Sequence, residues 1–288
     1  MSSTQANAIA PLRPVEALSS GEQFAQAYLE KGDKTEVHFD FTITEAFKPT
    51  QDRPRLMVSQ LFRKRLVSET HNRFWSESRP PKVEAGGIHE GDLRQEATFR
   101  FGMGEGIVRP ISAWVQLPPD LAGDERGIAE FIDYRLLVRL ATAENQALTF
   151  GPHGLLNHPG VTRLPYETSY FDGIMAACNA IEQNGATAHA MIVNPVDYYH
   201  GLLGKGILGD LQQNGTKIVR TRMVAPGCAL VGDFAVAARI LHTGKSVIRV
   251  GTPPAGTFAT EGTAVCAEIY EGLAVHLPTH FFHVVKAD

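Results

Sequence analysis

Apolar side chains recur at helical spacing in four stretches of the chain. The longest stretch runs from Ile128 to Phe150 and predicts a helix about 30 Å long, which makes it a structural spine rather than a connector. The other three helices are expected to begin at residues that commonly cap helices, namely Ser20, Ser169 and Asn194.

Shorter runs that alternate between apolar and polar residues, or that are apolar throughout, predict strands. The expected strands are residues 36–43, 98–101, 107–115, 189–193, 229–234, 246–250, 265–275 and 281–285. Helices and strands follow one another without regular βαβ alternation, so the expected fold class is α+β.

Between the first strands lies a segment too rich in glycine and charge to enter a core, with Gly86, Gly87, Gly91 and Asp92 at its centre. The runs 98–101 and 107–115 on its C-terminal side suggest a long hairpin with this segment at its tip. A two-stranded hairpin is marginally stable by itself, so this one is expected to lie on another surface.

A basic segment precedes the hairpin, because residues 53–79 carry seven Arg and Lys side chains but only two Glu side chains. One interpretation is a solvated basic face. The other is an arm that docks on a neighbouring, more acidic subunit, in which case Arg63, Lys64 and Arg65 are the candidate intersubunit contacts.

Net charge, cysteine content and the length of apolar runs argue against several classes of function. With 27 Lys and Arg against 31 Asp and Glu, the 288-residue chain has a net charge of −4, which disfavours a general nucleic-acid packager. Three cysteines without a CxxC pair exclude a disulfide framework and a cysteine-rich zinc site. We find no signal peptide and no apolar run long enough to span a membrane, so the expected location is the cytoplasm and no membrane partner is expected.

No motif predicts a catalytic, cofactor or metal site. The apparent phosphate-loop triplet has Arg239 where the motif needs glycine, and it precedes a strand rather than a helix. A proline interrupts the only histidine group, and histidines four apart on a strand lie some 13 Å apart, too far for one zinc ion. The candidates considered and rejected are Gly244-Lys245-Ser246, Cys178, His276, His280 and His283.

Five stretches, in their order along the chain, together resemble the major capsid proteins of tailed bacteriophages and their cellular relatives, the encapsulins. The matching strings cover roughly residues 53–286 and are Ile111-Ser112-Ala113-Trp114-Val115-Gln116-Leu117, the helix 131–150 with Gly154-Leu155-Leu156-Asn157, Ile192-Val193-Asn194-Pro195, Pro226-Gly227-Cys228 with the strand after it, and Glu268-Ile269-Tyr270-Glu271-Gly272.

The resemblance implies a shell subunit without enzymatic activity whose main partner is itself. It implies an N-terminal arm over residues 1–83, an extended hairpin (E-loop) over 84–113, a peripheral domain with the spine helix over 114–152, an axial domain over 153–261 and closing strands of the peripheral domain over 262–288. By the same analogy Lys205, Asp210 and Lys217 are candidates for a pore rim at a symmetry axis.

Some shells of this kind crosslink through an E-loop lysine and an asparagine of a neighbour. No lysine lies between Lys82 and Lys205, and residues 256–261 contain no asparagine, so we expect a shell held together non-covalently.

Two kinds of shell remain open. Only about twenty residues precede the first helix, which favours assembly without a fused scaffold and hence an encapsulin that encloses a cargo enzyme carrying a targeting segment. The alternative is a phage major capsid protein that encloses DNA. A third hypothesis, from another class, is a soluble enzyme with a pocket near Tyr198, Tyr199 and His200.

Overall fold

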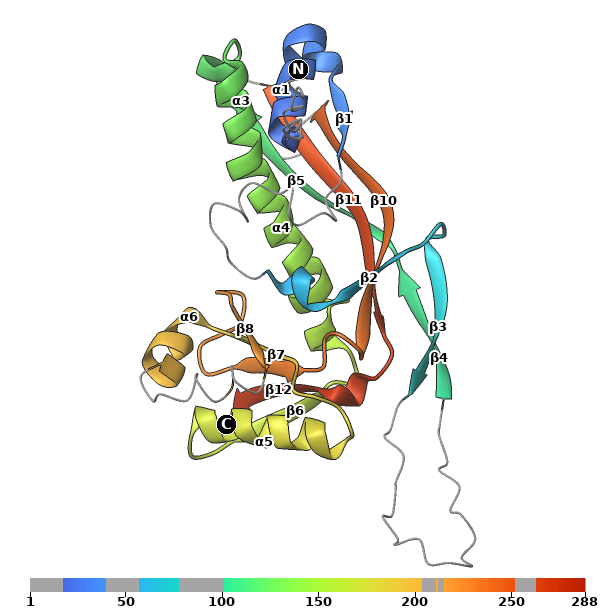
Figure 1. Ribbon diagram of the computed structural model, residues 1–288, viewed down its shortest axis with the longest axis vertical. Helices are drawn as coiled ribbons and strands as arrows, with labels where there is room; N and C mark the ends of the chain where they lie inside the picture. Colours follow the sequence, from blue (N-terminus) through green and yellow to red (C-terminus); the bar gives the residue numbers. More distant parts are fainter. Residues whose placement is uncertain are drawn as a thin grey trace, which may run out of the picture.

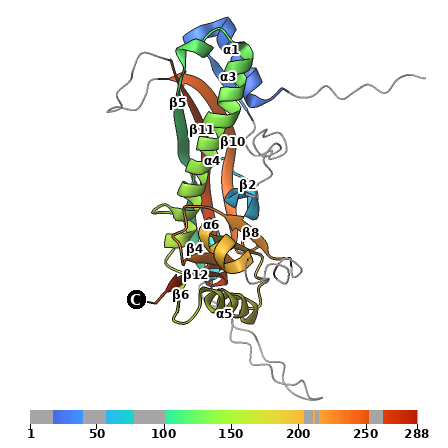
Figure 2. The ribbon, with the colours of Figure 1, turned by 90° about the vertical axis from the view of Figure 1, so that its left-hand side faces the viewer.

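The computed structural model describes residues 18–39, 57–77, 101–203, 211, 215–251 and 263–287. These residues form an elongated molecule with a long sheet and a long helix at one end and a second sheet at the other, as seen in Figures 1 and 2. A separate two-stranded hairpin leaves the side of the molecule where the two parts meet.

The long sheet has five strands in the order β1-β10-β11-β5, with β2 paired to β10. Neighbouring strands on the path run antiparallel, whereas β2 runs parallel to β10. The bounds are β1 Glu36–His38, β2 Arg63–Leu66, β5 Arg109–Leu117, β10 Ala238–Gly251 and β11 Thr263–Val275.

The predicted spine helix is confirmed and lies along one face of this sheet (Figure 1). It is continuous from α3 (Glu125–Phe131) through a π-helical segment to α4 (Leu137–Asn145), and a second π-helical segment carries it to Phe150. Its apolar stripe of Ile128, Ile132, Leu136 and Leu140 has no exposed surface, because these side chains pack on the sheet.

The first helix, α1 (Ser20–Lys31), packs beside α3 at the far end of the long sheet (Figure 1). Ser19 caps it, one residue before the expected cap, and exchanges hydrogen bonds with Glu22 in a capping box. The backbone N–H of Gly21 donates a 2.9 Å hydrogen bond to the buried carboxylate of Asp133, which ties the two helices together.

The second sheet has the order β6-β12-β9-β7-β8, and α5 (Tyr170–Gln183) covers one of its faces. The caps expected for its helices are confirmed, since Ser169 caps α5 and Asn194 caps α6 (Pro195–Asp197), which a π-helical segment extends to Leu203. The strand bounds are β6 Thr162–Tyr166, β7 Ala190–Val193, β8 Lys217–Arg220, β9 Ala229–Gly232 and β12 Phe281–Lys286.

The expected hairpin differs from the observed one. Most of the run 107–115, which was expected to belong to the hairpin, instead lies in β5 (Arg109–Leu117) and pairs with β11 in the long sheet. The hairpin consists of β3 (His71–Glu77) and β4 (Phe101–Ile107), so its first strand comes from the segment expected to be the arm. The prediction was wrong because glycines at 102, 104 and 106 are more typical of a loop than of a strand. Each of them nevertheless lies within β4.

Candidate assembly surface

Backbone hydrogen bonds join the two hairpin strands at the root and attach the other end of β3 to the body of the subunit. The N–H of Val108 donates to the carbonyl of Thr70, and the N–H of Glu77 donates to the carbonyl of His276, each at 2.8 Å. The hairpin therefore has a defined direction at its root.

One face of the hairpin is flat and turned toward the body. Phe74 lies over Gly104, where a Cβ would come within 2.6 Å of its ring, and Gly106 is buried against Leu241. A side chain at Gly104 would displace the ring of Phe74 on the neighbouring strand, and one at Gly106 would push the hairpin away from Leu241 of the long sheet.

The opposite face of the hairpin carries large apolar side chains that nothing in the described subunit covers. Trp75 is 66% exposed, and Met103, its register partner across the two strands, is 57% exposed. Phe101, at 60% exposure, packs against Trp75 in a T-shaped arrangement with the ring centroids 6.4 Å apart. A contiguous exposed apolar group of this kind is typical of an interaction surface. We call Trp75, Phe101 and Met103 the hairpin face.

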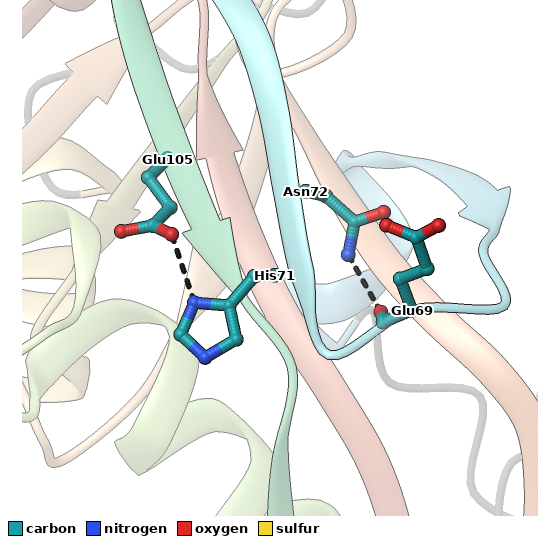
Figure 3. A network of polar contacts seen from close by, with 4 residues as sticks. All are labelled: Glu69, His71, Asn72 and Glu105. Carbon is teal, nitrogen blue, oxygen red and sulfur yellow. Dashed lines mark hydrogen bonds and ion pairs between the residues drawn. The ribbon is translucent and has the colours of Figure 1, made fainter.

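Polar contacts flank the hairpin face at the root (Figure 3). His71 Nδ1 lies 2.8 Å from Glu105 Oε1 across the two strands, and the side-chain amide of Asn72 donates to the carbonyl of Glu69 at 2.8 Å. His71 and Glu105 are more than half exposed, so this pair contributes little to stability.

The three basic residues singled out in the sequence lie on β2. Arg63 and Arg65 are exposed, which is compatible with a solvated face and with a contact to a neighbour. Lys64 corrects the expectation of an arm with unpaired cations, because its side chain points inward and forms ion pairs with the buried Glu144 and Glu271. Parallel pairing with β10 makes this segment part of the long sheet.

Of the pore-rim candidates, only Lys217 lies within the described residues. It is exposed at the start of β8, an edge strand of the second sheet. Lys205 and Asp210 lie outside the described residues, and so do the hairpin-tip residues Gly86, Gly87, Gly91 and Asp92.

The aromatic group considered for an enzyme pocket lies on the surface. The guanidinium of Arg220 lies 4.7 Å from the ring centroid of Tyr198 and donates a 2.7 Å hydrogen bond to the hydroxyl of Tyr199, which is 53% exposed. A cavity of about 230 Å³ borders Gly201 and Leu202, but none of Tyr198, Tyr199 and His200 lines it. The cluster is therefore a stacked cation–aromatic contact rather than a pocket.

The histidines and the cysteine that were considered as metal-binding or catalytic residues pack within the fold. Burial lowers the pKa of His280 and of His283, and the half-buried ring of His276 contacts the carbonyl of Trp75 at 3.0 Å. In the part of the chain that the structure describes, no three His, Cys, Asp or Glu side chains are grouped so that they could hold a metal ion. Cys178 packs in the core between α5 and the second sheet, and burial raises its pKa to about 11.

A cavity of about 430 Å³ lies between the hairpin root and the end of the spine helix. Glu105, Arg109 and Glu271 line it together with the loop of residues 151–159. Burial lowers the pKa of His158 in this loop, so the imidazole is neutral near pH 7.

Within the described ranges of the chain, no helix is long and apolar enough to cross a membrane.

No family model matches the chain. In sequence it is similar to the major capsid protein of Enterobacteria phage HK97, with 24% identity over 212 residues. The match covers 67% of this chain and 55% of the phage protein, so the chain spans about half the length of this curated relative.

Solved structures of very different sequence share the same architecture. The subunit of a virus-like particle from Pyrococcus furiosus superposes with a TM-score of 0.58 at 12% identity, over 83% of this chain and 96% of that chain. For the capsid of an empty GTA particle the TM-score is 0.56 at 15% identity, over 81% and 91% of the two chains. For Mycobacterium phage Ogopogo the TM-score is 0.53 at 13% identity, over 81% of this chain and 92% of that chain. The expected fold is thus confirmed, and the chain has the α+β fold of tailed-phage major capsid proteins.

Proposed function

We propose that this chain is a structural shell subunit that assembles with many copies of itself into a closed, hollow particle. The observation that carries the proposal is the hairpin face. It exposes Trp75, Phe101 and Met103 on a hairpin for which the described part of the chain provides no third strand. A second copy laid against this face would remove the apolar surface from water and stabilise the hairpin at the same time.

The expected division of the chain enters the proposal with the hairpin strands reassigned. Residues 1–83 would include the arm and the first hairpin strand β3, and 84–113 would include the rest of the E-loop with β4 and the start of β5. Residues 114–152 and 262–288 would form the peripheral domain, and 153–261 the axial domain. In this arrangement Arg63 and Arg65 contact a neighbour, Lys217 with Lys205 and Asp210 borders a pore, and the contacts are non-covalent.

For the content of the particle we propose a cargo protein, as in an encapsulin compartment in the cytoplasm. The net charge of −4 supports this choice, since a lumen that packs nucleic acid needs a surplus of cations. The second candidate is a phage capsid that encloses DNA, which the sequence similarity to the HK97 capsid protein favours.

Two measurements on the purified chain test the proposal. Electron microscopy should find closed particles of uniform diameter when the chain is expressed alone. Absorbance at 260 and 280 nm, followed by mass spectrometry of the content, separates the candidates: co-purified protein supports the compartment and long DNA supports the capsid. A chain that stays monomeric would contradict both.

A further inference from the structure

Three charged side chains from distant parts of the sequence meet where β2 crosses the spine helix. Lys64 reaches inward from β2, Glu144 comes from α4 and Glu271 from β11. The ammonium nitrogen of Lys64 lies 3.6 Å from Glu271 Oε1 and 3.8 Å from Glu144 Oε1. Glu144 is fully buried, Glu271 is 3% exposed, and the side chain of Lys64 is 22% exposed.

The charges of this cluster do not balance if both carboxyl groups are ionised. One ammonium would face two buried carboxylates, of which Glu271 is the nearer. Within the described chain, three carboxyl oxygens of the cluster lack a hydrogen-bond partner of good geometry. They are both oxygens of Glu144 and Oε2 of Glu271. A buried carboxylate in these surroundings takes up a proton rather than remain charged.

The surroundings place that proton on Glu144. Burial raises its pKa well above the usual range, and the negative charge of Glu271 raises it further, while Lys64 and the hydroxyl of Ser59 oppose the shift. In the long sheet, Glu271 on β11 is paired in register with Arg109 of β5 on one side and with His242 of β10 on the other. A negative charge is therefore better stabilised on Glu271, which also lies closer to Lys64.

Besides the backbone pairing of β2 with β10, the cluster attaches β2 to the body through the side chain of Lys64. Of the four residues of β2, only Lys64 is not exposed. The 3₁₀ turn before it, Val58–Leu61, contributes apolar contacts, and Phe62 packs edge-on against Phe234 at 5.3 Å between centroids.

We propose that Glu144 and Glu271 hold one proton between them beneath Lys64, and that this cluster is a pH-sensitive clamp that keeps residues 57–66 on the spine helix. When the proton is lost, two buried carboxylates repel each other and a single ammonium cannot neutralise them. Opening of the segment then lets water reach both groups. The clamp belongs to the folded subunit and does not depend on shell formation.

The sign of the pH dependence follows from the direction of the shift. The pKa of Glu144 is higher in the folded chain than in the unfolded chain. The clamp is therefore fully closed below the ordinary pKa of a glutamate and weakens as the pH rises toward the raised value.

Hydrogen exchange of the full chain tests the clamp. Protection of the amides of residues 57–66 is measured from about pH 5 to about pH 9, corrected for the intrinsic exchange rate, while the assembly state is monitored. Release of one proton can change this protection by at most about tenfold per pH unit. We expect protection to fall with pH in the wild type and to stay level in Glu144→Gln, which mimics the protonated acid. Glu130→Gln, an exposed change on the same helix, should keep the wild-type slope. Parallel slopes for wild type and Glu144→Gln would overturn the proposal.

Infrared spectroscopy gives a readout that does not require Glu144→Gln to fold. Near neutral pH the wild type and Glu130→Gln should show the carbonyl band of a protonated carboxylic acid. Glu271→Gln leaves a single carboxylate facing Lys64, so the band should weaken or vanish in this variant. A wild-type spectrum without the band near neutral pH would overturn the proposal.

Discussion

The ring of Phe74 on β3 packs edge-on against the imidazole of His276, with the ring centroids 4.9 Å apart. His276 follows the last residue of β11, so this contact joins the hairpin to the end of a central strand of the long sheet. The hairpin and the body therefore form one defined shape at the root. That shape determines where the hairpin face meets a neighbour.

The hairpin face should be needed for assembly and not for folding. Trp75→Ser combined with Met103→Ser removes apolar surface that only a neighbouring copy can bury. Loss of about 2 kcal/mol per contact would raise the concentration needed for assembly more than tenfold, as measured by light scattering. Thermal unfolding of the unassembled subunit should stay close to that of the wild type.

Met175→Ser is the matched control for this double variant, since Met175 is 41% exposed on α5, away from the hairpin. It should assemble at the wild-type concentration. Equal assembly of the hairpin-face variant and this control would show that the hairpin face is not an interface.

Gly272 should control the direction of the hairpin. A Cβ at this position would collide with the backbone carbonyl of Ile107, the last residue of β4. We expect Gly272→Ala to cost about 1–3 kcal/mol and to yield particles of altered or mixed diameter in electron micrographs. Gly201→Ala is the control, because among the described residues outside its own helical turn no atom lies within 4 Å of a Cβ placed there. Particles of unchanged diameter from a folded Gly272→Ala variant would contradict this role.

The basic residues of β2 should separate into two functions. Arg63→Ala with Arg65→Ala removes exposed cations and should impair assembly while the stability of the subunit changes by less than about 0.5 kcal/mol. Lys64→Ala leaves two buried carboxyl groups without their ammonium, so it should lower the free energy of unfolding by about 2 kcal/mol or more. Denaturant unfolding of the three proteins measures the difference. A Lys64→Ala variant as stable as the arginine double variant would contradict the assignment.

Cys178 should be the slowest of the three cysteines to react. It is 8% exposed, and because burial raises its pKa to about 11, only about one thiol in a thousand is ionised near pH 8. Alkylation of the native protein near pH 8, followed by peptide mass spectrometry, should modify Cys228 and Cys266 first. In denaturant the three should react at similar rates, and equal rates in the native protein would contradict the buried position.

The local parts of this fold were predictable from the sequence. Helical periodicity identified the spine helix, and local cap signals identified the starts of α5 and α6. Each of these features depends on residues close together in the chain, where the physical signal is strongest.

Features that depend on distant pairing were not predictable in this way. Strand β2 is short and polar, and only its parallel pairing with β10 defines it. The partners of Lys64 lie at positions 144 and 271, so the sequence alone presents an unpaired cation. The glycines of β4 indicate a loop until the contacts of Phe74 and Leu241 with them are known.

The central claim is that the subunit is completed by other copies of itself. Native mass measurement of the purified chain, over a wide range of concentration and salt, tests it most directly. A closed shell would be measured as a discrete species in the megadalton range, made of many 31.4 kDa subunits. A single species at the mass of one subunit under every condition would contradict it.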